Sequence, residues 1–267
     1  MDIKNDQIKR LLTLVTGVFR PPPGKRRIAV ALAYGAVCHI VFATAVLAMM
    51  VAMFFGMSRS FGQVPAPWSW AVNLLLILQF PIVHSILLSA AGRRALAWLG
   101  PKDYARTLST TTFAIVASVQ LVALFALWTP SGIIWWQAEG TAFAIVCILY
   151  ALSWALLIWA SFDAGAEVQS GALGWMSLVQ NITPRFPDMP TTGLFRVIRQ
   201  PIYLSFALTL WTVPVWTPDQ LMLAAILTAY CVAAPVMKER RFTARYGDRF
   251  SDYQRDVPYM IPGRPRR

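Results

Sequence analysis

Six apolar stretches divide the chain, and each reaches the roughly 20 residues that a helix needs to cross a lipid bilayer. They cover residues 28–57, 68–91, 107–128, 141–162, 194–216 and 218–237. Between the last two lies a short turn in which Pro218 and Asp219 suit the first turn of a helix. The pattern predicts an all-α integral membrane protein with about six transmembrane helices, the last two forming a hairpin.

Composition excludes a soluble protein. Hydrophobic residues make up 57% of the 267 residues, charged residues only 13%, and the mean hydropathy is +0.53. A globule of this size could not bury so much apolar side chain, so the chain must use lipid as its solvent.

A net charge of +12 could indicate a protein that binds nucleic acid, but the positions of the charges argue against it. Lys and Arg number seven in residues 1–27, four in 92–106, three in 163–199 and nine in 238–267, whereas the intervening loops hold only Arg59. Positive charge on alternate loops marks the cytoplasmic side of a membrane protein. We therefore expect both termini in the cytoplasm, a bacterial inner membrane, the lipid bilayer as a partner, and no nucleic acid.

The N-terminal segment, residues 1–27, lacks the apolar core of a secretory signal peptide. Residues 5–19 instead place apolar side chains on one helical face, which predicts a short helix lying on the cytoplasmic interface. Cys38, Cys147 and Cys231 fall inside predicted spans without metal-ligand spacing, and the chain has two histidines. We expect free thiols and no metal site.

Polar residues at the cytoplasmic ends of the last two spans are the candidates for chemistry, because polar groups are costly near lipid. Arg196 and Arg199 share a helical face, and Pro201 predicts that the helix begins there. A helix N-terminus beside arginines suits a carboxylate or a phosphate. The alternative is that both arginines only anchor the end of a span.

An aromatic stripe follows the last span. Phe242, Tyr246, Phe250 and Tyr253 recur at helical spacing, beside a parallel row of arginines, and Glu239 is the carboxylate that precedes them. This predicts a C-terminal cytoplasmic amphipathic helix. It either lies on anionic headgroups or folds back as a lid over the last two spans.

The stretch from Gly193 to Pro262 resembles the C-terminal core of the isoprenylcysteine carboxyl methyltransferase superfamily of integral membrane proteins. The matching residues are Arg199-Gln200-Pro201-Ile202-Tyr203, Glu239-Arg240, Tyr246-Gly247, Phe250, Tyr253 and Val257-Pro258. Upstream, Val83-His84-Ser85 and Ala105-Arg106-Thr107 are similar to the methanethiol S-methyltransferase and NnrU-like branch.

The resemblance implies a membrane methyltransferase that binds S-adenosylmethionine at the cytoplasmic ends of the last two spans. Arg199 and Glu239 become the catalytic candidates. The cofactor-binding candidates are Arg199, Gln200, Pro201, Tyr203, Glu239, Arg240 and Tyr246. An arginine, Arg199 or Arg240, can pair with the cofactor's carboxylate, and Glu239 with its ammonium or its ribose hydroxyls. His84 either faces the methyl acceptor or is a buried histidine bonded to a carbonyl.

The spans and the resemblance together divide the chain into an interfacial segment (1–27), a four-helix membrane part (28–163), a cytoplasmic loop (164–193) and a cofactor-binding core (194–267). Two positions depart from the superfamily pattern: Gln200 replaces its histidine, and Lys238 replaces the first acid of its acidic pair. An amide cannot act as a general base, so a small or lipophilic thiol, or a carboxylate, is the expected acceptor. Two alternatives stay open, a catalytically silent structural or assembly subunit and, with less support, an NADPH-dependent membrane reductase.

Overall fold

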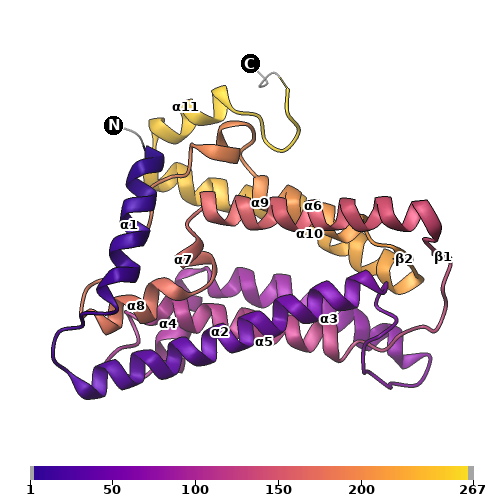
Figure 1. Cartoon of the computed structure of the whole chain (residues 1–267), viewed down its shortest axis with the longest axis horizontal. Helices are drawn as coiled ribbons and strands as arrows, with labels where there is room; N and C mark the ends of the chain where they lie inside the picture. Colours follow the sequence, from indigo (N-terminus) through magenta and orange to yellow (C-terminus); the bar gives the residue numbers. More distant parts are fainter. Residues whose placement is uncertain (1–2, 264–267) are drawn as a thin grey trace. The chain divides into compact units, whose positions relative to one another are not determined.

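The computed structural model describes residues 3–263, except for the side chains of residues 3–7, Ala90 and Arg93 (Figure 1). The C-terminal arginines of the predicted basic tail, Arg264, Arg266 and Arg267, lie outside the described residues, as does one arginine side chain of the predicted 92–106 loop.

Among the described residues, five helices are long and apolar enough to cross a membrane, and they confirm the all-α membrane fold. They are α2 (Lys25–Phe54), α3 (Trp68–Leu87), α5 (Ser109–Ala126), α6 (Gly140–Asp163) and α10 (Pro218–Tyr246). The outer face of α6 shows that these helices need lipid around them, because Ile148, Leu152 and Trp159 are each more than half exposed. Apolar faces of this extent are stable against lipid, not water. The three cysteines form no disulfide, as predicted.

In the fifth predicted span, residues 194–216, the helix is shorter than the apolar run. It comprises a 3-10 turn, η1 (Gly193–Arg196), the helix α9 (Pro201–Trp211) and a strand, β2 (Val215–Trp216). The 11 residues of α9 extend about 17 Å, against a hydrocarbon core of about 30 Å. Pro201 opens this helix as predicted, and β2 pairs antiparallel with β1 (Trp136–Gln137), which draws the chain out of helical geometry.

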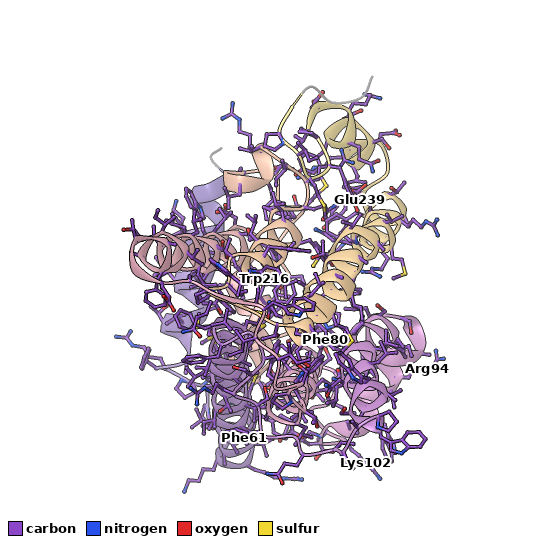
Figure 2. The ribbon with its side chains drawn as sticks, turned by 90° about the vertical axis from the view of Figure 1, so that its right-hand side faces the viewer. Phe61, Phe80, Arg94, Lys102, Trp216 and Glu239 are labelled. Carbon is purple, nitrogen blue, oxygen red and sulfur yellow. The ribbon has the colours of Figure 1, made fainter. Side chains whose placement is uncertain are left out.

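Contacts divide the chain into two compact units. The first takes the chain up to Met50, Ser60–Thr129 and Gly165–Asp188. Besides α2, α3 and α5 it holds α1 (Ile3–Gly17), α4 (Ala90–Leu99), α7 (Ala166–Gln169) and α8 (Ala172–Val179). The helix α4 lies where a basic loop was expected, because Ser89 caps it by accepting a hydrogen bond from the Gly92 amide at 3.1 Å. Figure 2 shows Arg94 on this helix and Lys102 beyond it, both exposed.

Within the first unit, α3 packs on α5, and α8 packs on both α5 and α1. Gln79 and Gln120 join α3 to α5 inside the predicted membrane region, where the Gln120 amide donates to the Gln79 side-chain oxygen at 2.6 Å. Polar pairs of this kind hold membrane helices together. The predicted N-terminal helix is present as α1, and the predicted loop 164–193 contains α7 and α8.

The second unit takes Val51–Arg59, Pro130–Ala164 and the chain from Met189 onward. In it α9 packs between α6 and α10, and the Asp163 carboxylate accepts the Leu194 amide at 2.8 Å, which joins α6 to η1. Thr217 caps α10 by accepting the Gln220 amide at 2.9 Å. At its other end α10 runs to Tyr246, and Gly247 turns the chain into α11 (Asp248–Asp256), which packs against α10. The predicted amphipathic helix is therefore divided at Gly247, with Phe242 and Tyr246 on α10 and Phe250 and Tyr253 on α11.

Candidate active site

The start of α9 is held by the C-terminal segment of the chain. Arg199 and Gln200 lie between η1 and Pro201, where the backbone is not helical and its amides need other acceptors. The Arg199 amide donates to the Pro258 carbonyl at 2.9 Å, and the Gln200 amide to the Tyr259 carbonyl at 3.1 Å. Two residues that precede α9 are thereby fixed to the segment that follows α11.

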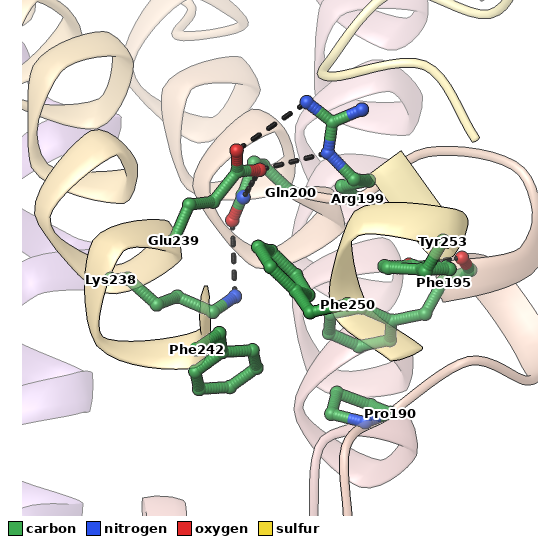
Figure 3. Close-up of a pocket in the computed structure, with 9 residues that line it drawn as sticks. All are labelled: Pro190, Phe195, Arg199, Gln200, Lys238, Glu239, Phe242, Phe250 and Tyr253. Carbon is green, nitrogen blue, oxygen red and sulfur yellow. Dashed lines mark hydrogen bonds and ion pairs between the residues drawn. The ribbon is translucent and has the colours of Figure 1, made fainter. Parts of the chain in front are cut away.

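Glu239, on the last turns of α10, is the centre of a polar network (Figure 3). Its Oε1 accepts from Arg199 Nε at 2.9 Å and from Gln200 Nε2 at 2.7 Å. Its Oε2 accepts from Gln254 Nε2 at 2.7 Å and from Arg199 Nη2 at 3.4 Å. The Arg199 and Glu239 side chains are only 13% and 12% exposed, so their pairing is shielded from water.

The C-terminal segment also occupies the other side of Arg199. Arg199 Nη1 donates to the carbonyls of Gln254, at 3.0 Å, and Val257, at 2.5 Å. The guanidinium lies over the Tyr259 ring, 5.6 Å from its centre. Most of the five donors of this guanidinium are therefore used by the chain itself.

Lys238 lies next to this network. Its Nζ donates to Gln200 Oε1 at 3.0 Å, so Gln200 bridges the lysine to Glu239. The same Nζ lies 5.5 Å from the ring centres of Phe195 and Phe242 and 5.8 Å from that of Tyr203. Contact with three ring faces stabilises an ammonium that has left bulk water.

These side chains line a small pocket (Figure 3), around which the empty space, open solvent included, is about 210 Å³. Its polar lining is Arg199, Gln200, Lys238 and Glu239, and the rest is Pro190, Phe195, Phe242, Phe250 and Tyr253. One wall thus comes from α11 and the opposite one from α10. Charged groups that converge in an aromatic pocket are typical of ligand sites.

Tyr253 fastens α11 over the pocket. Its hydroxyl donates to the Phe195 carbonyl at 2.5 Å, which joins α11 to η1. Burial raises the pKa of Tyr253, and the neighbouring Arg199 guanidinium opposes that shift only in part. The phenol therefore stays a neutral donor over the whole physiological pH range.

The structure brings together most of the predicted site residues. Arg199, Gln200 and Glu239 line the pocket, Tyr203 faces Lys238, and Pro201 is buried at the start of α9. The remaining candidates take other positions. Arg240 is exposed, and Tyr246 packs edge-on against Phe242 outside the lining. His84 belongs to the first unit and lies between the rings of Phe80 and Phe113.

Sequence reasoning missed Gln254 and Phe195. A signal for Gln254 was available, because it follows Phe250 by four residues and therefore shares its helical face. Phe195 precedes the helix and carries no periodic signal, so only the fold of η1 brings it to the pocket.

The chain is similar to several named proteins. It is 30% identical to methanethiol S-methyltransferase 2 of Bradyrhizobium diazoefficiens, over 72% of both chains. It is 26% identical to the methanethiol S-methyltransferase of Pseudomonas deceptionensis, over 73% of this chain and 74% of that one. Human nurim is 27% identical over 62% of this chain and 64% of its own.

No family model and no solved structure matches the chain. The names of these relatives nevertheless agree with the family that the sequence motifs resemble, which is a family of integral membrane proteins. With 30% identity across more than two thirds of a relative, the chain belongs to the methanethiol S-methyltransferase family, within the isoprenylcysteine carboxyl methyltransferase-like superfamily.

Proposed function

We propose that this protein transfers a methyl group from S-adenosylmethionine to a small thiol at the cytoplasmic face of a bacterial inner membrane. The observation that carries the proposal is the Arg199–Glu239 pair, which lines an aromatic pocket where α9 begins and α10 ends. The relatives named methanethiol S-methyltransferase supply the reaction class.

The residues present fit the charged groups of S-adenosylmethionine. Arg199 would pair with its carboxylate, and Glu239 would accept hydrogen bonds from its ammonium or its ribose hydroxyls. Aromatic side chains such as Phe250 offer apolar contacts for the rest. When bound, the cofactor supplies a methyl group on a positively charged sulfur, which any nearby nucleophile can accept.

The pocket volume adds a condition. The lining side chains nearly fill the pocket, and the space left between them admits about one water molecule, far less than the roughly 300–1,000 Å³ of sites that enclose molecules of cofactor size. Arg199 is also occupied by the carbonyls of Gln254 and Val257. We therefore propose that α11 moves away to admit the cofactor and then closes over it, which would exclude water from the reacting groups.

The length of α10 supports a site at the membrane surface. Its 29 residues extend about 44 Å, more than the hydrocarbon core of about 30 Å. The last turns, which carry Glu239 and several arginines, would project beyond the lipid. The distribution of positive charge favours the cytoplasm for that end, where the cofactor is available.

Binding of S-adenosylmethionine to the purified protein tests the proposal. We expect saturable binding by the wild type, weakened at least about 100-fold in Arg199→Ala and in Glu239→Ala, because each loses charge-assisted hydrogen bonds. Arg196→Ala is the matched control, since this exposed arginine lies three residues away and outside the pocket lining. No binding by folded wild type, or an equal loss in the control, would contradict the proposal.

A second candidate, a structural subunit without catalytic activity, is favoured by one observation. Arg199 and Glu239 are already engaged by groups of the chain itself. Ethanethiol, supplied with S-adenosylmethionine, separates the two candidates: an enzyme forms ethyl methyl sulfide, which gas chromatography detects. Wild type that binds no cofactor and forms no sulfide would favour the structural role.

A further inference from the structure

Lys238 has donors to spare. An ammonium carries three N–H donors, and among the described residues its Nζ has one hydrogen-bond acceptor, Gln200 Oε1. The remaining contacts of Nζ are with the rings of Phe195, Tyr203 and Phe242. A cation at the edge of a pocket, with unused donors, is suited to receive an anion.

The charges around Lys238 favour an anion as well. On α10 its neighbours are Glu239 and Arg241; Arg199 precedes α9, Tyr203 lies on α9 and Tyr253 on α11. Glu239 is the one carboxylate in this set, and its oxygens are covered by the Arg199 guanidinium and by two amides. The negative charge of Glu239 is thus largely compensated by its own donors, whereas the Lys238 ammonium contacts an amide oxygen and three rings and no carboxylate among the described residues.

Resting on the proposed function, we infer that Lys238 binds the methyl acceptor as a thiolate and holds it in the ionised form. The ligand class is a small alkyl thiolate, with its sulfur against Nζ and its carbon against the aromatic wall. Gln200, which replaces the histidine of the superfamily pattern, contacts Lys238 directly. An amide cannot remove a proton, but an ammonium beside the sulfur makes the proton leave more easily.

The lining favours a thiolate over a carboxylate or a phosphate. Oxyanions require several strong donors, and this part of the pocket offers one ammonium, because the side-chain amide of Gln200 is committed to Glu239. A thiolate is large, polarisable and weakly hydrated, and sulfur packs well against aromatic ring edges.

The reaction balances without a protein base. The thiol first loses its proton to water, assisted by the positive charge of Lys238. An electron pair of the thiolate then forms the new sulfur–carbon bond to the methyl group while the old carbon–sulfur bond breaks, and that bond's electron pair remains on the donor sulfur. One anion and one cation become two neutral thioethers. The product no longer pairs with Lys238, which would favour its release.

Ionisation of a bound thiol can be measured directly with 2,2,2-trifluoroethanethiol, whose fluorine NMR signal differs between thiol and thiolate. Titrating the probe on purified full-length protein, without S-adenosylmethionine, should give a bound thiol pKa at least about one unit below that of the free probe, the shift expected beside an opposite charge. In Lys238→Met the bound thiol pKa should equal or exceed the free value, because only desolvation remains. Lys238→Arg should restore the lowered value.

The methyl thioether of the same probe is the control ligand. It carries no charge, so its affinity should differ by less than about threefold between wild type and Lys238→Met, which would show that the pocket has kept its form. A wild-type bound pKa at or above the free value, no saturable probe binding, or an equal lowering in Lys238→Met would overturn the inference. If Lys238→Met does not fold, the wild-type titration alone decides. Because the titration needs no cofactor, a failure to bind S-adenosylmethionine would contradict the proposed function and leave this result intact.

Discussion

Two Arg–Glu pairs hold different parts of this molecule, and they have different surroundings. In the first unit, Glu167 on α7 is 3% exposed and accepts a hydrogen bond from Arg10, which also donates to the Arg185 carbonyl at 2.9 Å. In the second unit, Glu239 accepts from Arg199 and two amides and lines the pocket.

The difference shows that a buried ion pair does not by itself identify a site. Arg10 and Glu167 connect α1 to α7, and neither lines the pocket. Glu239 and Arg199 connect elements too, but they also border space that Lys238 and aromatic rings enclose. We assign the first pair to structure and the second to ligand binding, and the following substitutions test that division.

The largest contrast is expected between Glu239→Ala and Glu167→Ala. Glu239→Ala should weaken binding of S-adenosylmethionine at least about 100-fold, whereas Glu167→Ala should change it less than about threefold. Glu167→Ala should instead lower stability by about 1–3 kcal/mol, because Arg10 loses its charged partner. Calorimetric titration and thermal unfolding measure the two effects. Equal losses of binding in both variants would remove the distinction.

The sequence predicted the helices better than the site, and the reason is physical. Apolar runs fix where a membrane helix lies, and Pro201 marks the start of α9 through its own geometry. The same run could not reveal that α9 ends at Trp211, because β2 pairs with a strand about 80 residues earlier in the chain.

The site could be predicted from the sequence only in part, for the same reason. Helical spacing predicted one aromatic face that includes Phe242 and Phe250, yet Gly247 divides that helix, and the spacing did not tell what either half meets. Lys238 departs from the superfamily pattern, and its role depends on Gln200, 38 residues away, and on three rings from separate segments. Contacts of this range arise from packing, which a periodic pattern does not encode.

Gly247→Ala should release α11 while leaving the ion pairs of the first unit unchanged. Gly247 has φ 54° and ψ −129°, a conformation that costs other residues roughly 2 kcal/mol, and open space surrounds its Cα. Cleavage by trypsin after Arg249 and Arg255 should become about 30-fold faster. Gly132→Ala is the control, because this glycine has φ +74° and equally open surroundings away from α11. Equal acceleration in the control would contradict a hinge at Gly247.

Two glutamines, one in each unit, allow the same comparison with smaller expected effects. Gln254 donates to Glu239, and Gln180 donates to the Leu14 carbonyl at 2.8 Å, which fastens α1 in the first unit. Gln254→Leu should speed cleavage of α11 about tenfold, since a hydrogen bond to a charged group contributes about 1.5 kcal/mol. Gln180→Leu should instead expose α1, with cleavage after Arg10. Mass spectrometry of the fragments distinguishes the two, and release of the opposite helix in either variant would count against independent docking.

Tyr253→Phe should have the smallest effect, and its sign depends on pH. At neutral pH the loss of the hydrogen bond to the Phe195 carbonyl should cost about 1 kcal/mol and lower the apparent Tm slightly. Because burial raises the pKa of Tyr253, the folded phenol stays protonated where the unfolded phenol ionises, so the wild type loses stability as pH rises above the ordinary tyrosine value of about 10. Phenylalanine has no proton to lose, so the Tm difference between the two chains should narrow from pH 8 to pH 10.5. A difference that stays constant over this range would mean that the hydroxyl of Tyr253 is not shielded from water, and that α11 does not close the pocket in the way its contacts indicate.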